Sequence, residues 1–175
     1  MQFDRQYQRL NAEEQLLSYG EEQNIVIGIL RIAGIIGPDR IPNKRIINRE
    51  SVIRVSQAPW SNTIFIYDLV NIALLVARKL RKNNIFNVSD GIASPMGSTH
   101  RLLSIIMGIN TVFEECFEDI LLKASPMKKE FLLSSKKLSI DKLKNFLGDD
   151  LVLTEKIEAL KISLAESTAV DEVYL

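Results

Sequence analysis

The sequence predicts an α/β fold in which a parallel sheet is followed mainly by helices. The first observation is the segment 24–36, which is rich in isoleucine and valine and lacks polar alternation, as is typical of a strand covered on both faces. The second is that two further short apolar strands, at 64–66 and 85–88, enclose a helical pattern over 68–80. Strands separated by helices favour an α/β class over an all-α or all-β class.

The composition is that of one ordinary globular domain. The chain has 175 residues, of which 46% are apolar and 25% are charged, enough for a real hydrophobic core. The 22 lysines and arginines balance the 22 aspartates and glutamates, so no net charge draws the chain to nucleic acid or an acidic membrane. The single cysteine, Cys116, excludes an internal disulfide framework and is expected to be a small buried side chain in a reducing compartment.

No stretch of the sequence reads as a membrane span or a secretion signal. The two longest apolar runs are interrupted by Arg31 and Asp68, and they fall short of the ~18 apolar residues that a membrane span needs. No apolar stretch follows the charges at residues 1–5, so a signal peptide is not expected. We therefore predict a cytoplasmic location.

We also expect no metal site. His100 is the only histidine, is expected at the surface near a helix start, and has no second ligand at metal-binding spacing. Four acidic residues between 114 and 119 lie within a predicted helix over 111–123. Because histidine and a calcium-loop pattern are missing there, a solvated helix face is the simpler interpretation.

The N-terminal part is expected to form one helix and one strand. Residues 4–19 have a helical pattern, and Gly20 is expected to end this helix through a left-handed cap. The strand over 24–36 comes next, and Pro38 marks the loop after it. Arg31 within the strand needs a partner or an exit to solvent, and a structural ion pair is preferred over a ligand contact.

The later elements are predicted from helix caps and apolar spacing. Asp68 is expected to cap the helix over 68–80, and Ser98 or Thr99 to cap a helix that stops at Gly108. The other expected elements are a short helix at 45–48, a short strand at 52–55, a helix over 111–123, a short helix from Ser139 to Gly148 and a last helix over 154–165.

Five segments carry a resemblance to a known family. Residues 9–13 read RLNAE, residues 29–40 form the apolar strand that ends at Gly-Pro, and residues 62–69 read NTIFIYDL. Residues 86–91 read FNVSDG, and residues 136–148 contain KKLS followed by a Leu-Gly turn. In this order the segments resemble the C-terminal portion of the NAD-dependent epimerase/dehydratase family, the extended or atypical short-chain dehydrogenases. The resemblance implies a partial Rossmann-like NAD(P)-binding fold.

The resemblance implies one domain over residues 1–175 that has two parts. Residues 1–38 supply a helix and a sheet strand, and residues 39–175 supply a substrate-side region with the late strands and helices. The glycine-rich turn of the family's N-terminal, dinucleotide-binding half does not occur in this sequence.

A second departure from the family pattern concerns catalysis. The family places a tyrosine and, four residues later, a lysine on the helix before the Gly-Pro strand. Here Arg5 and Arg9 stand at those positions, and Tyr7 projects from a different side of the helix than Arg9. Arginine keeps its proton and differs in shape, so it does not replace the lysine. We therefore assign no catalytic residue and expect this chain alone to be inactive and to bind no NAD(P). A complete relative would bind NAD(P) and act on a sugar-nucleotide-like or small carbonyl substrate.

The resemblance also implies where the ligands of a complete relative would lie. Ala33, Gly34 and Pro38 are expected at the rim of the cofactor site, and the substrate is expected over loops that carry Arg40, Asn62, Phe65 and Tyr67. Each has a structural alternative: a solvated charge for Arg40, core packing for Phe65 and Tyr67, a helix cap for Asp68, and turn formation for Asn87 and Asp90.

Two alternatives to a truncated enzyme stay open. The chain could be a non-catalytic binding module that pairs through an exposed sheet edge, with a second copy of itself or with a complementary protein chain. Alternatively, Met1 could be a misassigned start or the edge of a fragment, with the coding region continuing upstream.

Overall fold

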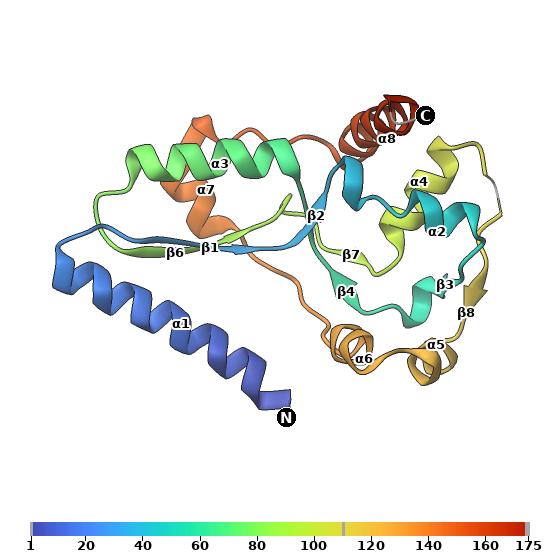
Figure 1. The fold of residues 1–175 in the computed structure, drawn as a ribbon, viewed down its shortest axis with the longest axis horizontal. Coiled ribbons are helices and arrows are strands. Elements are labelled where there is room, and N and C mark those ends of the chain that lie inside the picture. The colour runs from blue at the N-terminus through green and yellow to red at the C-terminus, as the bar shows by residue number, and fades with distance from the viewer. Residues whose placement is uncertain (1, 110, 174–175) are drawn as a thin grey trace.

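The structure, a computed structural model, describes the backbone of residues 2–109 and 111–173 and the side chains of 7–109 and 111–167. Short strands alternate with helices, and the strands pair mainly in parallel, so the predicted α/β class is confirmed (Figure 1). In chain order the elements are α1 (Gln2–Gln23), β1 (Gly28–Ile32), β2 (Gly34–Ile36), η1 (Pro38–Arg40), α2 (Asn43–Ile47), β3 (Val52–Ile53), η2 (Val55–Gln57), β4 (Trp60–Ser61), β5 (Thr63–Phe65), α3 (Ile66–Lys79), β6 (Asn84–Val88), β7 (Ser94–Pro95), α4 (Ser98–Ile106), β8 (Glu114–Glu115), α5 (Phe117–Lys123), α6 (Pro126–Leu132), α7 (Asp141–Leu147), η3 (Gly148–Asp150) and α8 (Lys156–Val173).

The predicted strand over 24–36 is two strands that pair with different neighbours. β1 pairs in parallel with β6, with Ile32 opposite Val88, and β2 pairs in parallel with β5, with Ile36 opposite Phe65. The change of partner occurs at Ala33, whose N–H donates to the Val88 carbonyl at 3.0 Å. The run therefore takes part in two parallel strand pairs in succession, first β1–β6 and then β2–β5.

The predicted helix over 111–123 is wrong in its first half. Residues 114–115 form β8, which pairs in parallel with β3, and only α5 is helical. The backbone of Phe113 and Glu115 accepts hydrogen bonds from Val52 and Arg54, at 2.9 and 3.0 Å. A partner sixty residues away thus overrides the local helical preference. β4 and β7 form the antiparallel pair of the fold, with Trp60 opposite Pro95.

Two apolar cores lie on opposite sides of β5. Ile64 is fully buried in a core with α3, β6 and α7, whereas its neighbour Phe65 is buried in a core with α4 and α8. Successive side chains of a strand point to opposite faces, so two adjacent residues serve two cores. The first core also contains Phe86, which packs on Phe146 of α7 with ring centroids 4.8 Å apart.

Helix α3 begins two residues earlier than predicted. Its first residue is Ile66 and its N-cap is Phe65, so Asp68 lies inside the first turn and does not cap the helix. The Asp68 carboxylate is buried and instead accepts hydrogen bonds from the backbone N–H and the hydroxyl of Thr154, both at 2.8 Å. The predicted cap on α4 is also wrong, because Gly97 is the N-cap and the Ser98 hydroxyl donates to the Pro95 carbonyl at 2.6 Å.

Helix α1 runs past the predicted stop at Gly20. It ends at Gln23, and Asn24 takes the left-handed conformation with φ of 55°. Gly20 is needed for another reason: a Cβ there would lie 2.5 Å from Cγ1 of Ile27 and 2.7 Å from the carbonyl oxygen of Ile25. The returning chain therefore packs directly on the helix backbone at this point.

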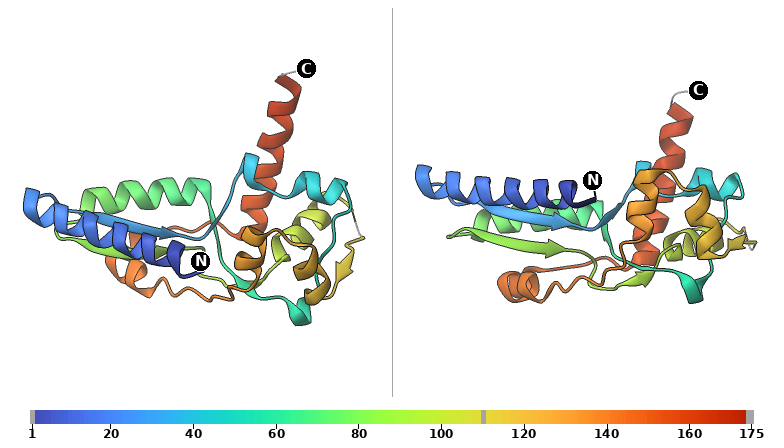
Figure 2. Two further views of the ribbon diagram at one scale, coloured as in Figure 1. Left: turned by 60° about the horizontal axis from the view of Figure 1, so that its bottom comes forward. Right: turned by 90° about the horizontal axis from the view of Figure 1, so that it is seen from below.

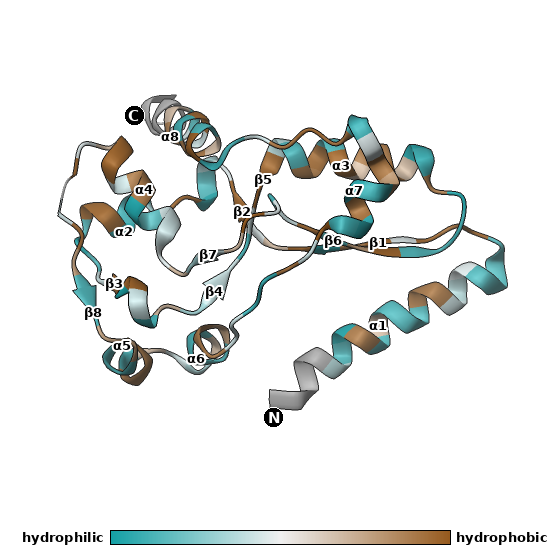
Figure 3. Ribbon diagram, turned by 180° about the vertical axis from the view of Figure 1, so that it is seen from behind, coloured by the Kyte–Doolittle hydropathy of each residue, from teal (hydrophilic) through white to brown (hydrophobic). Residues whose placement is uncertain are grey.

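The layer formed by α1 and β1 is less covered than the two apolar cores beside β5. Figure 2 shows α1 on the β1 side of the strand pair, with α7 on the β6 side. Figure 3 shows apolar residues along β1 and interspersed with polar ones on α1. Gly20 is the only buried residue among the described side chains of α1, and Ile32 at the end of β1 is 48% exposed. The prediction that both faces of the 24–36 strand are covered thus fails at β1.

Candidate functional site

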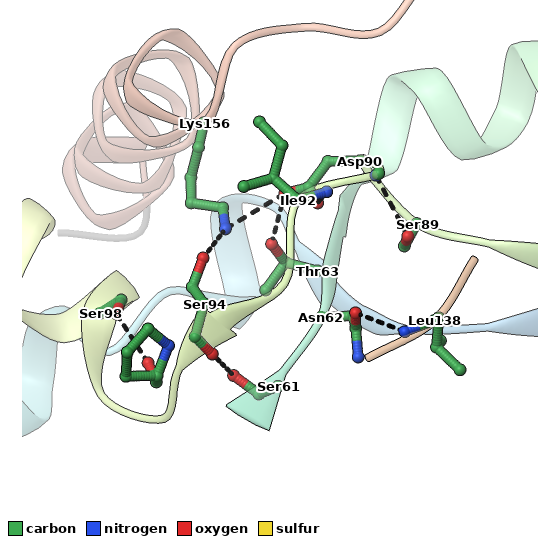
Figure 4. Close-up of polar contacts among 12 residues, drawn as sticks. Ser61, Asn62, Thr63, Ser89, Asp90, Ile92, Ser94, Ser98, Leu138 and Lys156 are labelled. Carbon is green, nitrogen blue, oxygen red and sulfur yellow. Dashed lines mark hydrogen bonds and ion pairs between the residues drawn. The ribbon is translucent and has the colours of Figure 1, made fainter. Parts of the chain in front are cut away.

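The strand ends meet at one place, where the chain passes from β1 to β2. The Gly34 N–H donates to the Asn62 carbonyl at 3.1 Å, and the Asp90 N–H donates to the Thr63 carbonyl at 2.7 Å. The chain just past the end of β6, at Asp90, and the start of β5, at Thr63, therefore lie side by side (Figure 4). Ala33 is next to them, because its N–H donates to the Val88 carbonyl. In open α/β sheets, ligands bind beyond the carboxyl ends of parallel strands, so this junction is the candidate site.

Asp90 is the centre of the polar contacts at the junction. Its carboxylate accepts hydrogen bonds from the Thr63 hydroxyl at 2.8 Å and the Ile92 N–H at 2.9 Å. It also forms an ion pair with Lys156 at 3.2 Å, and the ammonium of Lys156 donates to the Ser94 hydroxyl at 2.9 Å. The side chains of Lys156 and Asp90 are only 12% and 9% exposed. This nearly buried pair anchors the start of α8 to the end of β6, and Asp90 forms the turn that the sequence predicts.

Asn62 clamps a segment from far along the chain. Its side-chain amide donates to the Lys136 carbonyl at 2.8 Å, and its oxygen accepts the Leu138 N–H at 3.0 Å. The side-chain amide of Asn87 likewise donates a hydrogen bond to the Ser139 carbonyl, at 3.3 Å. Both ends of the Asn62 amide are thus used to hold the backbone before α7.

The Gly-Pro turn leads into a rim formed by η1 and α8. Pro38 is the first residue of η1, which packs on α8, and Arg40 at its end is exposed. Tyr67 is 48% exposed, and its hydroxyl donates to the Glu166 carboxylate of α8 at 2.9 Å. That hydrogen bond to a carboxylate raises the pKa of Tyr67. Phe65 is buried and contacts Tyr67 edge to face, with ring centroids 5.1 Å apart.

The predicted site residues therefore fall into two groups. Ala33, Gly34 and Asn62 meet at the strand junction through backbone hydrogen bonds. Pro38, Arg40 and Tyr67 belong to the rim beside α8, and Phe65 lies in the core beneath it. A groove of about 220 Å³ between α3 and residues 150–152 contains none of these residues.

Sequence reasoning missed the contribution of Lys156. It pairs with Asp90 across 66 positions of sequence, and no local pattern connects them. The sequence around Thr154 and Lys156 predicts that a helix begins there, but it does not indicate which residue Lys156 pairs with. Arg31, by contrast, forms the predicted structural ion pair, with its Nε donating to the Glu13 carboxylate at 2.9 Å.

His100 is buried, contrary to the expectation of a surface position. It is 6% exposed, and its Nδ1 has no hydrogen-bond partner in the described part of the chain. Burial, followed by the charges of Arg45 and Arg101, lowers the pKa of His100. It is buried where α4 packs against α2, a tertiary contact that the sequence of the first turn of α4 does not reveal.

The acidic residues between 114 and 119 do not share one helix face. Glu114 on β8 binds Arg101 at 2.6 Å, and Glu115 binds Lys123 at 2.8 Å. Cys116 is half-buried rather than buried, and a hydrogen bond to Asp119 raises its pKa. Over the described ranges, no three His, Cys, Asp or Glu side chains come close enough to hold a metal ion.

The described residues do not fit a dinucleotide. The pyrophosphate of such a cofactor needs a glycine-rich turn between a parallel strand and a helix, with backbone amides open to it. Here α3 follows β5 directly, with Phe65 as its N-cap. Gly97, the N-cap of α4, has φ of 90°, but a Cβ there would lie 2.9 Å from Nη1 of Arg101, so the guanidinium covers this helix start. Arg5 lies in α1, outside the described side chains, and Tyr7 is 69% exposed.

Comparisons with known proteins identify the fold. No protein-family model matches the sequence, and no curated protein matches it either. Among solved structures, the chain is similar to the UDP-glucose 4-epimerase of Thermotoga maritima, with 19% identity and a TM-score of 0.71 over 93% of this chain and 52% of that chain. It is also similar to the UDP-N-acetylglucosamine 4-epimerase of Methanobrevibacter ruminantium, with 16% identity and a TM-score of 0.70 over 94% of this chain and 53% of that one.

A third solved structure of the same fold contains a dinucleotide. It is the Bordetella bronchiseptica enzyme WbmF in complex with NADH, with 15% identity and a TM-score of 0.69 over 92% of this chain and 51% of that chain. The chain thus spans about half the length of each of these structures. The partial Rossmann-like fold predicted from the sequence is confirmed. In the described residues, no helix is both long enough and apolar enough to cross a membrane.

Proposed function

We propose that residues 1–175 are the substrate-side part of an NAD(P)-dependent epimerase/dehydratase-like protein that acts on a sugar nucleotide, in the reducing compartment that a single cysteine fits. The observation that carries the proposal is the strand run β1–β2, which changes partner at Ala33 and ends in the turn before Arg40. Solved UDP-sugar 4-epimerases share this fold at TM-scores of 0.70 and 0.71.

The same residues are proposed to be inactive by themselves. The tyrosine and lysine positions of the family pattern hold Arg5 and Arg9, and arginine does not give up its proton near neutral pH. Gly97, the N-cap of α4, is covered by the Arg101 guanidinium and is not open to a phosphate. A titration of NADH and NADPH, followed by nicotinamide fluorescence, tests this part. No saturable signal is expected, and saturable binding at micromolar concentration would contradict it.

Arg40 is the proposed contact for the substrate's diphosphate. It is exposed beyond the strand ends, and its side chain forms no hydrogen bond or ion pair with the described residues. Asn62 and Phe65, by contrast, are occupied by the clamp on residues 136–138 and by the core. Arginine binds phosphate oxygens through charge-assisted hydrogen bonds.

UDP-glucose titrated into isotope-labelled chain tests this contact. Amide signals of Gly37 and of residues 39–41 are expected to shift, and Arg40→Ala is expected to weaken binding by about tenfold, the loss of one charge-assisted hydrogen bond. Arg54→Ala is the matched control, because Arg54 is an exposed arginine immediately before η2 and outside the rim. Equal losses in the two variants, or no shift at Gly37 and residues 39–41, would contradict the proposal.

A further inference from the structure

The outer edge of β1 is an open row of backbone hydrogen-bonding groups. The Asn84 N–H donates to the Ile27 carbonyl at 3.0 Å, and the Ala33 N–H donates to the Val88 carbonyl at 3.0 Å. Because alternate residues of a strand bond to the same neighbour, the odd-numbered residues of this stretch serve β6. Gly28, Leu30 and Ile32 therefore direct their N–H and C=O groups to the opposite edge, where no described strand lies.

This edge lacks the features that usually protect an exposed strand. β1 contains no proline and no lysine, and its one charge, Arg31, is held by Glu13 of α1. Apolar side chains continue the edge, since Ile25, Val26 and Ile32 are each about half exposed. An uncharged, apolar edge of this kind favours pairing with another strand.

Helix α1 extends the uncovered surface past the edge. Figure 2, in the view from below, shows α1 beyond β1 on the side away from β6. The helix is fixed on the Ile29 and Arg31 face of the strand by the Glu13 ion pair, yet its Leu16 and Tyr19 are about half exposed. A helix that overhangs the edge of a two-stranded parallel sheet is placed to cover strands that would continue that sheet.

We propose that the open edge of β1 and the overhanging side of α1 form a docking surface for a second α/β unit, which adds a parallel strand to β1. Two observations select this occupant over a second copy of the chain. β1–β6 and β2–β5 are both parallel pairs, and parallel sheets are covered by helices on both faces. The solved structures of this fold are about twice as long as this chain, which covers 51–53% of each. The choice of partner, but not the open edge itself, depends on the proposed function.

The docking test mixes the full 175-residue chain with the part of the Thermotoga maritima UDP-glucose 4-epimerase that this chain does not match. Light scattering is expected to show a one-to-one complex, and amide exchange at Gly28, Leu30 and Ile32 is expected to slow within it. Ile32→Lys places a charge on the edge and is expected to weaken the complex by about tenfold or more. Ile47→Lys is the control, because Ile47 is 63% exposed on α2.

Three results would overturn the docking proposal. They are the absence of a complex, a complex with unchanged exchange at the three amides, and self-association of the chain alone that protects those amides. The last would make a second copy the occupant. UDP-glucose binding is measured separately, so its loss with docking retained would count against the proposed function alone.

Discussion

The two sides of the strand junction differ in how completely their apolar residues are covered. Around β5, Ile64, Leu103 and Leu160 are fully buried between α3, α4, α7 and α8. In the α1–β1 layer, Leu16 and Ile32 are about half exposed although they are equally apolar. The chain thus buries the apolar residues around β5 and leaves those of the α1–β1 layer partly exposed, so its stability is expected to depend mainly on the buried side.

The largest expected effect tests the covered side. Leu160→Ala removes a fully buried side chain of α8 and is expected to cost about 4 kcal/mol of unfolding free energy. Leu16→Ala, in the uncovered layer, is expected to cost less than about 0.5 kcal/mol. Denaturant unfolding followed by Trp60 fluorescence and by circular dichroism measures both. Similar losses in the two variants would mean that α1 is as well packed as α8.

The next effect concerns the ion pair at the junction. Lys156→Met leaves the Asp90 carboxylate nearly buried without its cation and is expected to cost about 3 kcal/mol. Lys123→Met is the matched control, because Lys123 is 70% exposed in its pair with Glu115 and its loss should change the unfolding free energy much less. Adding Asp90→Asn to Lys156→Met should recover part of the loss. A loss no larger than in the control would show that α8 is not anchored through this pair.

The smallest expected effect is the pH dependence of the unfolding free energy that His100 causes. Its pKa is lowered in the folded chain by burial, with Arg45 and Arg101 adding to the shift and Glu50 opposing it. The folded state therefore binds the proton less readily than the unfolded state. The free energy of unfolding should therefore be highest above about pH 6.5, the pKa of histidine in the unfolded chain. It should fall as the pH drops below that value. His100→Gln should flatten the unfolding free energy between pH 7.5 and 5.5, and an unchanged slope would assign the dependence to other groups.

Much of the fold follows from local patterns in the sequence. The isoleucine-rich run, the helix over 68–80 and the strand at 85–88 all occur within a few residues of their expected positions, as β1–β2, α3 and β6. Arg31 could be predicted to pair because a charge on a sheet face requires a partner. These features depend on apolar spacing, caps and turns, which act over a few residues.

The sequence-based predictions that differ from the structure concern features that depend on contacts between distant residues. β8 is two residues long and exists because Val52 lies opposite Glu114. His100 is buried because α2 packs on α4, and Asn62 is occupied because residues 136–138 return to it. Gly20 lies within α1, where a side chain would collide with Ile25 and Ile27. The strand ends at which the sequence places the candidate site do meet in the structure, whereas the contacts of the side chains there depend on tertiary packing.

Amide hydrogen exchange of the 175-residue chain alone tests the central claim, that β1 is hydrogen-bonded to β6 along one edge and open along the other. In β1, Ile29 and Arg31 direct their amides to β6 and should exchange slowly, at rates set by unfolding of the core. Gly28, Leu30 and Ile32 should exchange much faster, because no described strand accepts their hydrogens. Equally slow exchange at all five residues would contradict an open edge.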